Sequence, residues 1–540
     1  MAPYLSTTES CVSDTTPGLG ELVNKQNKIT AKRIVATTDE PHGAILSRAG
    51  EVGDLIDAVK DLIVPFIRDA DEATPSRVRG TPCEPGKNVL VEALQPEELM
   101  RRMDVTMPDV QNDGRTGILD LIQLVLKYSV NTWDQGFLDK LCASTDAVGV
   151  ASELVLAALN TNAHVYRVSP ALTIIEKVTA KSLASLFGLV GPHAGGITCQ
   201  GGSASNMTSL VTARGALYPD TKRVGNGNHR FVVFANEHGH YSIEKAAMAC
   251  GFGLGSVVPV PADKQGRMDP VALARLVVEA KQSGRTPLYV SATAGTTVLG
   301  AYDPLRAVSA VCKEHGMWMH VDASWGGAAV FSAKHRHKLD GTELADSLTF
   351  NPHKMLHVPA ACSFLLTRDT RVFQRANTLP ADYLFHDKAA TGEEAETWDM
   401  ADFTLQCGRR ADSLKMALSW TYYGTKGFEA AVDRSFATAA YFASLVDKHP
   451  DFKLASHLPL PSLQVCFYYT PGGQLGDDLE NTRRTRLMIS KLLHRGFMVD
   501  RAPGPSGSFF RIAFNLQTLQ STVEGLLVAL AEVGKEVVSS

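Results

Sequence analysis

An aspartate and a lysine each follow a short apolar segment in the middle of the chain. Asp322 ends the segment Met317–Val321, and Lys354 follows Ser347–Phe350, 32 residues after Asp322. If both segments are strands of an open α/β sheet, both side chains lie at carboxyl ends, where ligands bind. A lysine amine can hold an aldehyde as a Schiff base, and a buried carboxylate can keep a pyridine nitrogen protonated. Each residue alone would be an ordinary loop charge, but together they predict a site for pyridoxal 5'-phosphate (PLP).

Two further segments could complete such a site. Gly201–Asn206 precedes a predicted helix, Met207–Leu217, and backbone amides at a helix N-terminus can cradle a phosphate. Ser and Asn also cap ordinary helices, so this motif gains weight only because the cofactor carries a phosphate. His240 follows the predicted strand Phe231–Phe234, where an imidazole could stack on the pyridine ring. A histidine in a surface loop is the alternative.

Arg511 is a charge inside the apolar segment Phe509–Phe514, which reads as a strand. A guanidinium in that setting needs an anionic partner. The partner is either a substrate carboxylate, which suits the bidentate geometry of arginine, or an acidic residue of the protein itself.

The composition is that of an ordinary globular protein. The 540 residues are 44% hydrophobic and 20% charged, with a formal net charge of −4. This balance argues against nucleic-acid binding, and no apolar run is long enough to span a membrane. Nine scattered cysteines without a CxxC pair are typical of reduced thiols, so we expect a cytoplasmic protein with no disulfide framework and no metal site.

The pattern of elements predicts four regions. Residues 1–50 read as a disordered or surface arm, and 51–165 as an N-terminal helical segment. In 166–395, short apolar strands alternate with helices, which predicts a cofactor-binding α/β domain with a mostly parallel sheet. Residues 396–540 read as a smaller α+β domain.

Taken together, these residues resemble the group II PLP decarboxylases, and most of all the animal-type glutamate and cysteine sulfinate decarboxylases. The resemblance runs from about residue 131 to the C-terminus. It is carried by several stretches: Asn160–Asn162, Gly201–Asn206, His238–Ser242, Val290–Gly300, Trp318–Gly327, Asn351–Met355, Tyr383–Phe385, Gln406–Arg409 and Phe509–Arg511. It implies the aspartate-aminotransferase fold (fold type I), with helices on both faces of a mostly parallel central sheet, and a homodimer.

The resemblance also implies a role for each matching residue. Lys354 would carry the cofactor, Asp322 would pair with the pyridine nitrogen, and His240 would stack on the ring. Thr297 would lie near the ring hydroxyl, and Arg511 would bind the substrate α-carboxylate. The cofactor phosphate would be held by Ala204, Ser205, Asn351 and His353.

Two positions depart from the animal pattern. A mobile-loop tyrosine that donates a proton in those enzymes is replaced by Trp398, whose indole N–H is too weak an acid to substitute. Another residue, such as Tyr383 or His386, would then protonate the substrate carbon, or oxidation would compete. A substrate-facing glutamine is replaced by Lys140, and a cation there suits a short acidic side chain.

The resulting hypothesis is α-decarboxylation of an acidic L-amino acid, with a lean to L-aspartate giving β-alanine. L-Glutamate giving GABA and cysteine sulfinate giving hypotaurine are the other acidic substrates. Decarboxylation-dependent oxidative deamination to an aldehyde is an alternative because of Trp398. Another fold-type-I reaction, or a catalytically silent homologue, is disfavoured by the joint presence of Lys354, Asp322, His240 and Arg511.

Overall fold

The computed structural model describes residues 47–84, 88–107, 114–142, 144–379 and 397–539. The chain divides into two compact units, 1–57 and 58–540. Most of the arm predicted for residues 1–50 lies outside the described residues. The unit boundary does not test the predicted limits at residues 165 and 395, which stay predictions.

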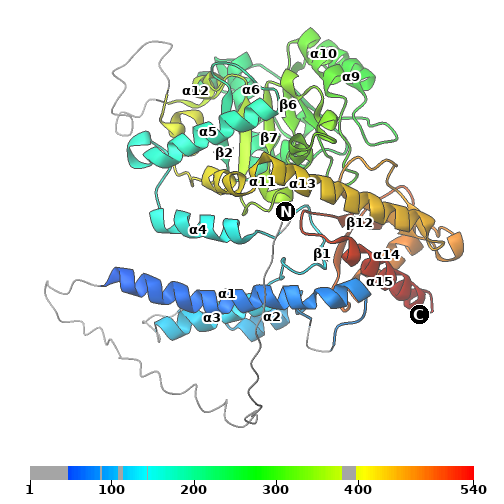
Figure 1. Cartoon of the computed structure of the whole chain (residues 1–540). Coiled ribbons are helices and arrows are strands. Elements are labelled where there is room, and N and C mark those ends of the chain that lie inside the picture. The colour runs from blue at the N-terminus through cyan, green and yellow to red at the C-terminus, as the bar shows by residue number, and fades with distance from the viewer. Residues whose placement is uncertain (1–46, 85–87, 108–113, 143, 380–396, 540) are drawn as a thin grey trace, which may run out of the picture. The chain divides into compact units, whose positions relative to one another are not determined.

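The long unit contains a sheet of seven strands (Figure 1). Its spatial order is β2-β8-β7-β6-β5-β3-β4. The strands from β7 to β4 in this order are all parallel, whereas β8 is antiparallel to both of its neighbours. The mostly parallel sheet predicted from the sequence is therefore confirmed. The bounds are β2 Gly195–Cys199, β3 Phe231–Asn236, β4 Val257–Val260, β5 Thr286–Thr293, β6 Trp318–Asp322, β7 Ser347–Phe350 and β8 Ser363–Thr367.

Helices cover both faces of this sheet, which explains why its strands are continuous apolar runs. In β3, Val232 and Phe234 pack into one core with helices α5 (Pro170–Leu186), α9 (Pro270–Gln282) and α10 (Leu305–His315). Phe231 and Val233 point to the opposite face, because successive side chains alternate along a strand. There they pack against α6 (Gly202–Leu217) and α8 (Ser242–Ala249).

A second sheet of five strands, in the order β1-β11-β12-β10-β9, forms near the C-terminus. Helices α13 (Ser413–Lys448), α14 (Asp478–Leu493) and α15 (Gln520–Val538) pack beside it (Figure 1). Its first strand comes from a segment that the sequence assigned to the N-terminal helices. The bounds are β1 Phe137–Leu138, β9 Phe452–Leu454, β10 Gln464–Tyr469, β11 Met498–Ala502 and β12 Phe509–Ala513. Only β1 pairs in parallel, with β11.

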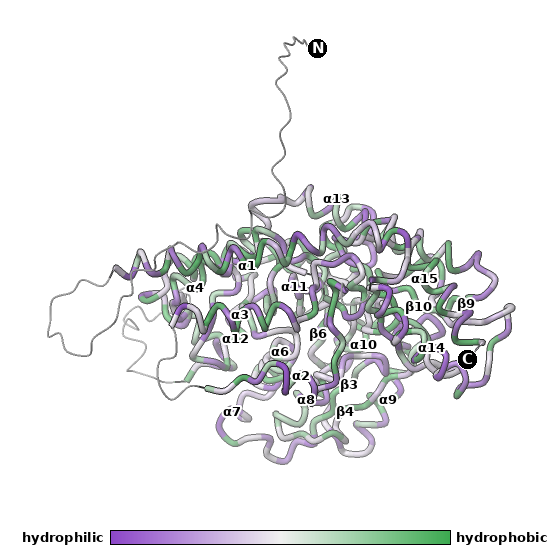
Figure 2. Tube along the Cα trace, turned by 90° about the horizontal axis from the view of Figure 1, so that it is seen from below, coloured by the Kyte–Doolittle hydropathy of each residue, from purple (hydrophilic) through white to green (hydrophobic). Residues whose placement is uncertain are grey.

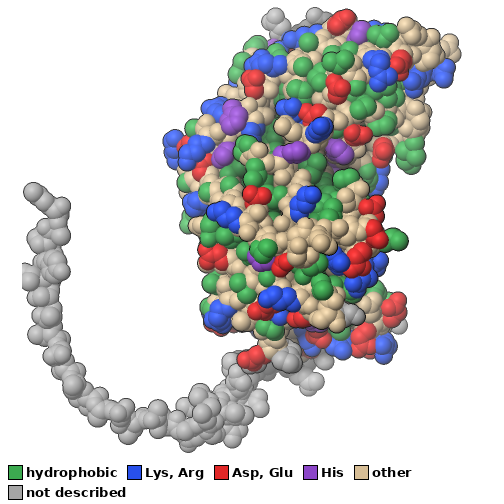
Figure 3. All heavy atoms as spheres, turned by 90° about the vertical axis from the view of Figure 1, so that its right-hand side faces the viewer, with side chains coloured by type: hydrophobic (Ala, Val, Ile, Leu, Met, Phe, Trp, Pro, Cys, Tyr) green, Lys and Arg blue, Asp and Glu red, His purple; other side chains and the backbone are tan. Residues whose placement is uncertain are grey.

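The remaining helices are α1 (Arg48–Arg79), α2 (Pro96–Met103), α3 (Arg115–Tyr128), α4 (Ala147–Leu159), α7 (Thr221–Val224), α11 (Pro352–Met355) and α12 (Arg371–Asn377). Apolar and polar residues alternate along α1 and α3 (Figure 2), as in amphipathic helices. None of the helices in the described ranges has the length and apolar character needed to cross a membrane. On the face drawn in Figure 3, basic and acidic side chains are interspersed.

Helix α6 begins at Gly202, five residues before the predicted start at Met207. Small polar residues weaken a helix-propensity pattern, so the first turn was not recognised in the sequence. Gly201 precedes the helix with a φ of 85°, a left-handed conformation that favours glycine. The consequence is that Gly202 and Ser203 form the helix N-terminus itself.

Candidate active site

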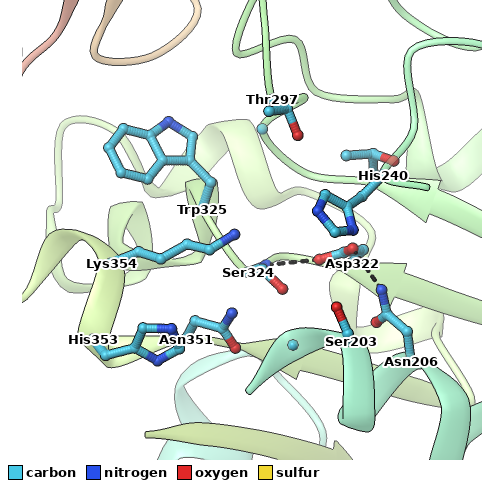
Figure 4. Close-up of a pocket in the computed structure, with 13 residues that line it drawn as sticks. Ser203, Asn206, His240, Thr297, Asp322, Ser324, Trp325, Asn351, His353 and Lys354 are labelled. Carbon is cyan, nitrogen blue, oxygen red and sulfur yellow. Dashed lines mark hydrogen bonds between the residues drawn. The ribbon is translucent and has the colours of Figure 1, made fainter. Parts of the chain in front are cut away.

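A cavity of about 210 Å³ opens where the parallel strands β5, β6 and β7 end (Figure 4). Asp322 is the last residue of β6, and Thr293 is the last residue of β5. The cavity is lined by Gly202, Ser203, Asn206, His240, Thr293, Gly295, Thr297, Asp322, Ser324, Trp325, Asn351, His353 and Lys354. Eight residues were expected at the cofactor site, and six of them line the cavity: His240, Thr297, Asp322, Asn351, His353 and Lys354.

Lys354 points into this cavity from α11, the short helix that follows β7 (Figure 4). Burial lowers the pKa of its amine, against the opposing effect of the Asp322 carboxylate and the Cys142 thiol. Within the described part of the chain, Lys354 forms no ion pair within 4.0 Å. Its nitrogen is therefore available for covalent chemistry, since only a neutral amine attacks a carbonyl.

Asp322 is held from two sides inside the same cavity. Asn206 donates its amide N–H to Asp322 Oδ2 at 2.9 Å, and the backbone N–H of Ser324 donates to Oδ1 at 3.0 Å. Burial alone would raise the pKa of Asp322, but Lys354, Ser324 and Asn206 outweigh it, so the pKa lies below its usual range. The carboxylate stays ionised and can keep a proton on a facing nitrogen.

His240 approaches the cavity from the loop after β3 and is half-buried. Its Nδ1 accepts a hydrogen bond from the backbone N–H of Ser242 at 3.2 Å. Burial lowers the pKa of the ring, although Asp322 acts in the opposite direction. The neutral imidazole therefore carries its proton on Nε2.

The end of the cavity suited to a phosphate is formed by the N-terminus of α6 and by Asn351 and His353. Of the residues predicted to hold the phosphate, Asn351 and His353 line the cavity, whereas Ala204 and Ser205 do not. Ser205 Oγ instead bonds to Ser363 Oγ at 2.7 Å in the interior. From the first turn of α6, Gly202 and Ser203 line the cavity, whereas the phosphate-binding role of Ala204 and Ser205 stays a prediction. The backbone amides of this first turn remain available to an anion.

Arg511 and Lys140 lie at the second sheet, close to the cavity but not among its lining residues. Arg511 is buried, and its Nη1 donates to the carbonyl oxygen of Thr297 at 2.9 Å, which connects it to the cavity wall. Its Nη2 forms an ion pair with Asp500. Lys140, whose side chain is 60% exposed, pairs with the same carboxylate at 2.9 Å and with Asp139 at 3.3 Å. Asp500 was not singled out from the sequence.

Trp398 does not line the cavity. Its ring contacts that of Tyr166 edge-to-face, with 5.9 Å between the ring centroids, and Lys177 Nζ lies 4.3 Å from the centroid of the Trp398 ring. Tyr383 and His386, the other residues considered as proton donors, lie outside the described residues.

Comparison with known proteins agrees with this geometry. The model of the pyridoxal-dependent decarboxylase conserved domain matches residues 96–470, well over half of the chain. The chain belongs to this decarboxylase family. It is 57% identical to the L-aspartate decarboxylase dtxS4 of Metarhizium robertsii over 92% of this chain and 99% of the relative. It is 41% identical to a glutamate decarboxylase-like protein of Gibberella zeae, over 78% of this chain and 88% of the relative.

Solved structures support the same fold. Mouse CSAD in its apo form superposes with a TM-score of 0.80 at 33% identity, covering 90% of this chain and 99% of that one. Oryza sativa TDC with PLP and tryptamine superposes with a TM-score of 0.80 at 23% identity, covering 92% and 99%, a likeness of fold alone. The protein is a fold-type-I, PLP-dependent amino acid decarboxylase.

The residues of the cavity fit PLP, the cofactor of the family. A Cβ added at Gly202 would lie 2.7 Å from Asn351 Nδ2 and 2.8 Å from Ser324 Oγ, so only glycine leaves this end of the cavity open. Asn351 Oδ1 is buried without a hydrogen-bond partner among the described residues. Such an orphaned acceptor fits a site whose occupant supplies hydrogen-bonding groups. The Lys354 amine matches the aldehyde of the cofactor, the Asp322 carboxylate matches its ring nitrogen, and the N-terminus of α6 matches its phosphate.

Proposed function

We propose that this decarboxylase removes the α-carboxylate of an acidic L-amino acid, with L-aspartate as the preferred substrate and β-alanine as the product. The placement of the Lys354 amine and the Asp322 carboxylate in one cavity supports PLP chemistry, and the match to the decarboxylase family supports decarboxylation. The lean to aspartate is supported by the relative named L-aspartate decarboxylase, which matches 99% of its own length at 57% identity.

Each side chain of the cavity has a part in this proposal. PLP, when bound, supplies an aldehyde for the amine and a protonated ring that accepts the electron pair left by CO₂. Lys354 would hold the cofactor, because its neutral amine can condense with the aldehyde. Asp322 keeps the ring nitrogen protonated because its carboxylate stays ionised. His240 would lie against the ring and carries its proton on Nε2.

The substrate carboxylates require cations, and we propose Arg511 for the α-carboxylate and Lys140 for the side chain. Arg511 is anchored to the cavity wall through Thr297, and the Nε of its guanidinium is buried without a hydrogen-bond partner among the described residues. Both cations already share Asp500, so a bound substrate must exchange with that carboxylate. If Lys140 binds the side-chain carboxylate of a short acidic substrate in this way, the enzyme would favour aspartate over glutamate.

A substrate panel tests the proposal. Aspartate, glutamate, cysteine sulfinate and an aromatic amino acid are compared, with CO₂, amine, aldehyde and hydrogen peroxide all measured. We expect CO₂ and amine in equal amounts, the highest kcat/KM for aspartate, and no peroxide. Aldehyde with peroxide would indicate oxidative deamination, and faster turnover of the aromatic substrate would remove the acidic assignment.

We also propose that the protein acts as a homodimer in the cytoplasm. Apolar side chains on α3 and α4 are more than a third exposed, namely Ile118, Leu121, Val125, Val150, Leu154, Val155 and Leu159. Apolar surface on two neighbouring segments is typical of an interface between subunits. Sedimentation of an active sample should give twice the 58.2 kDa mass of one chain. An active species at the monomer mass would exclude the dimer.

A further inference from the structure

A chain of buried hydrogen bonds leads away from the cavity, beginning at Asp322. Asn206 donates to Asp322 Oδ2 at 2.9 Å, and its Oδ1 lies 3.1 Å from His320 Nε2. His320 Nδ1 lies 2.8 Å from Ser347 Oγ, which also accepts the indole N–H of Trp318 at 2.9 Å. All five residues are buried. Figure 4 shows the first link, between Asp322 and Asn206.

Chemistry sets the direction of the link between Asn206 and His320. An ionised carboxylate only accepts hydrogen bonds, so Asn206 must turn its amide nitrogen toward Asp322. The same nitrogen also donates to Ser242 Oγ at 2.9 Å. The amide oxygen therefore faces His320, and because an amide oxygen cannot donate, His320 Nε2 carries the proton. Thr349 Oγ1 lies 3.3 Å from the same nitrogen, and its hydroxyl oxygen can accept from that N–H as well.

The rest of the chain follows from that assignment. His320 lies in the interior, and burial lowers the pKa of its ring to about 4, so the ring is neutral and holds one proton. Nδ1 must then accept, and the Ser347 hydroxyl is its donor. Trp318 can only donate, which leaves the Ser347 oxygen as its acceptor. Every bond from Trp318 to Asp322 thus has a single direction.

We propose that His320 is a positioning residue for the cofactor: its Nε2–H locks the Asn206 amide in the one orientation that donates to Asp322. With that donor lost, the Asn206 oxygen is left buried and without its partner, so the amide is held less firmly and its hydrogen bond to Asp322 weakens. Asp322 would then shift or take up a proton, and its hold on the ring nitrogen would weaken. The inference rests on the proposed role of Asp322 at the cofactor ring.

Two substitutions by side-chain amides of different length separate this role from simple packing. In His320→Gln the side-chain amide nitrogen reaches the place of Nε2, so the donor to Asn206 is kept. In His320→Asn the shorter side chain reaches only the place of Nδ1, so the donor is lost. We expect wild-type PLP affinity and cofactor absorption spectrum in His320→Gln. In His320→Asn we expect the PLP dissociation constant to rise and kcat to fall by roughly tenfold each, with KM little changed.

The dissociation constant is measured by titrating the apoprotein with PLP, with no substrate present. Asn206→Ala provides the coupling test, because adding His320→Asn to it should weaken PLP binding no further if His320 acts through Asn206. Ser347→Ala, which removes a single hydroxyl, serves if His320→Asn does not fold. It frees the ring to carry its proton on Nδ1, so PLP binding should weaken in the same direction.

Equal PLP affinity and spectra in the Gln and Asn variants would overturn the inference, as would wild-type PLP binding in Ser347→Ala. Asp322→Asn separates this outcome from a failure of the underlying role. If Asp322→Asn changes the spectrum and His320→Asn does not, only the role of His320 is lost. If Asp322→Asn leaves the spectrum unchanged, the role of Asp322 itself is wrong.

Discussion

Asp500 and Arg511 lie opposite each other on the paired strands β11 and β12 and form an ion pair. The same Asp500 carboxylate accepts a hydrogen bond from Lys140, which follows β1 on the far side of β11. Both cations proposed for the substrate are therefore already neutralised in part. A substrate carboxylate that replaces Asp500 is therefore stabilised only by the difference between the free energy of its own contacts and that of the contacts that Asp500 gives up.

This relationship limits what Lys140 can contribute to specificity. Its side chain is 60% exposed, and exposed ion pairs are worth at most about 1 kcal/mol. We therefore expect Lys140→Gln to lower the kcat/KM ratio of aspartate to glutamate by no more than about fivefold. Steady-state kinetics on both substrates measure the ratio, and Asp500→Asn is the matched control. An unchanged ratio in Lys140→Gln would show that Lys140 does not read the side chain.

The covalent link to the cofactor provides a second prediction. Lys354→Arg keeps the positive charge but has no neutral amine, so it should lose the absorption band of the bound cofactor and nearly all turnover. Borohydride reduction of the wild-type enzyme, followed by peptide mapping, should place the phosphopyridoxyl mass on Lys354. The mass on any other lysine would remove this assignment.

Much of the candidate site could be predicted from the sequence, because its main residues follow strands with strong local patterns. β6 and β7 are short apolar runs, so the positions of Asp322 and Lys354 at their carboxyl ends followed from strand geometry alone. The alternation of helices with short strands likewise indicated a mostly parallel sheet, and the family resemblance implied helices on both of its faces.

Long-range pairing could not be predicted. β1 has two residues, too few to show a period, and it joins a sheet whose other strands lie more than 300 residues later. Its recruitment brings Lys140 beside Asp500, and no local pattern marks Asp500 as a partner of Arg511. The start of α6 was missed for a different reason, since glycine and serine have low helix propensity and tertiary packing overrides it.

Asp322 provides a third prediction. Asp322→Asn keeps the shape of the side chain but removes the charge that holds a proton on the ring nitrogen. Turnover should fall by orders of magnitude, whereas covalent attachment to Lys354 should persist, because the amine is unaffected. Comparing kcat with the yield of borohydride-trapped cofactor separates the two effects. Near-normal turnover in Asp322→Asn would mean that another group protonates the ring.

The buried His320 makes stability depend on pH. Its pKa is lowered from 6.5 to about 4 in the folded protein because burial disfavours the charged ring. A proton therefore binds the unfolded chain more tightly, so the contribution of this residue is complete above pH 6.5 and is lost as the pH falls toward 4. Integrated over that range, the loss is at most about 3 kcal/mol.

His320→Gln does not titrate, so its thermal midpoint should fall less than that of wild type between about pH 7 and about pH 5. Taking the difference between the two proteins cancels the other titrating groups, among them His357, whose pKa is also about 4. Equal falls in the thermal midpoints of the two proteins would show that folding does not lower the pKa of His320, and the directions assigned to its hydrogen bonds would then be wrong.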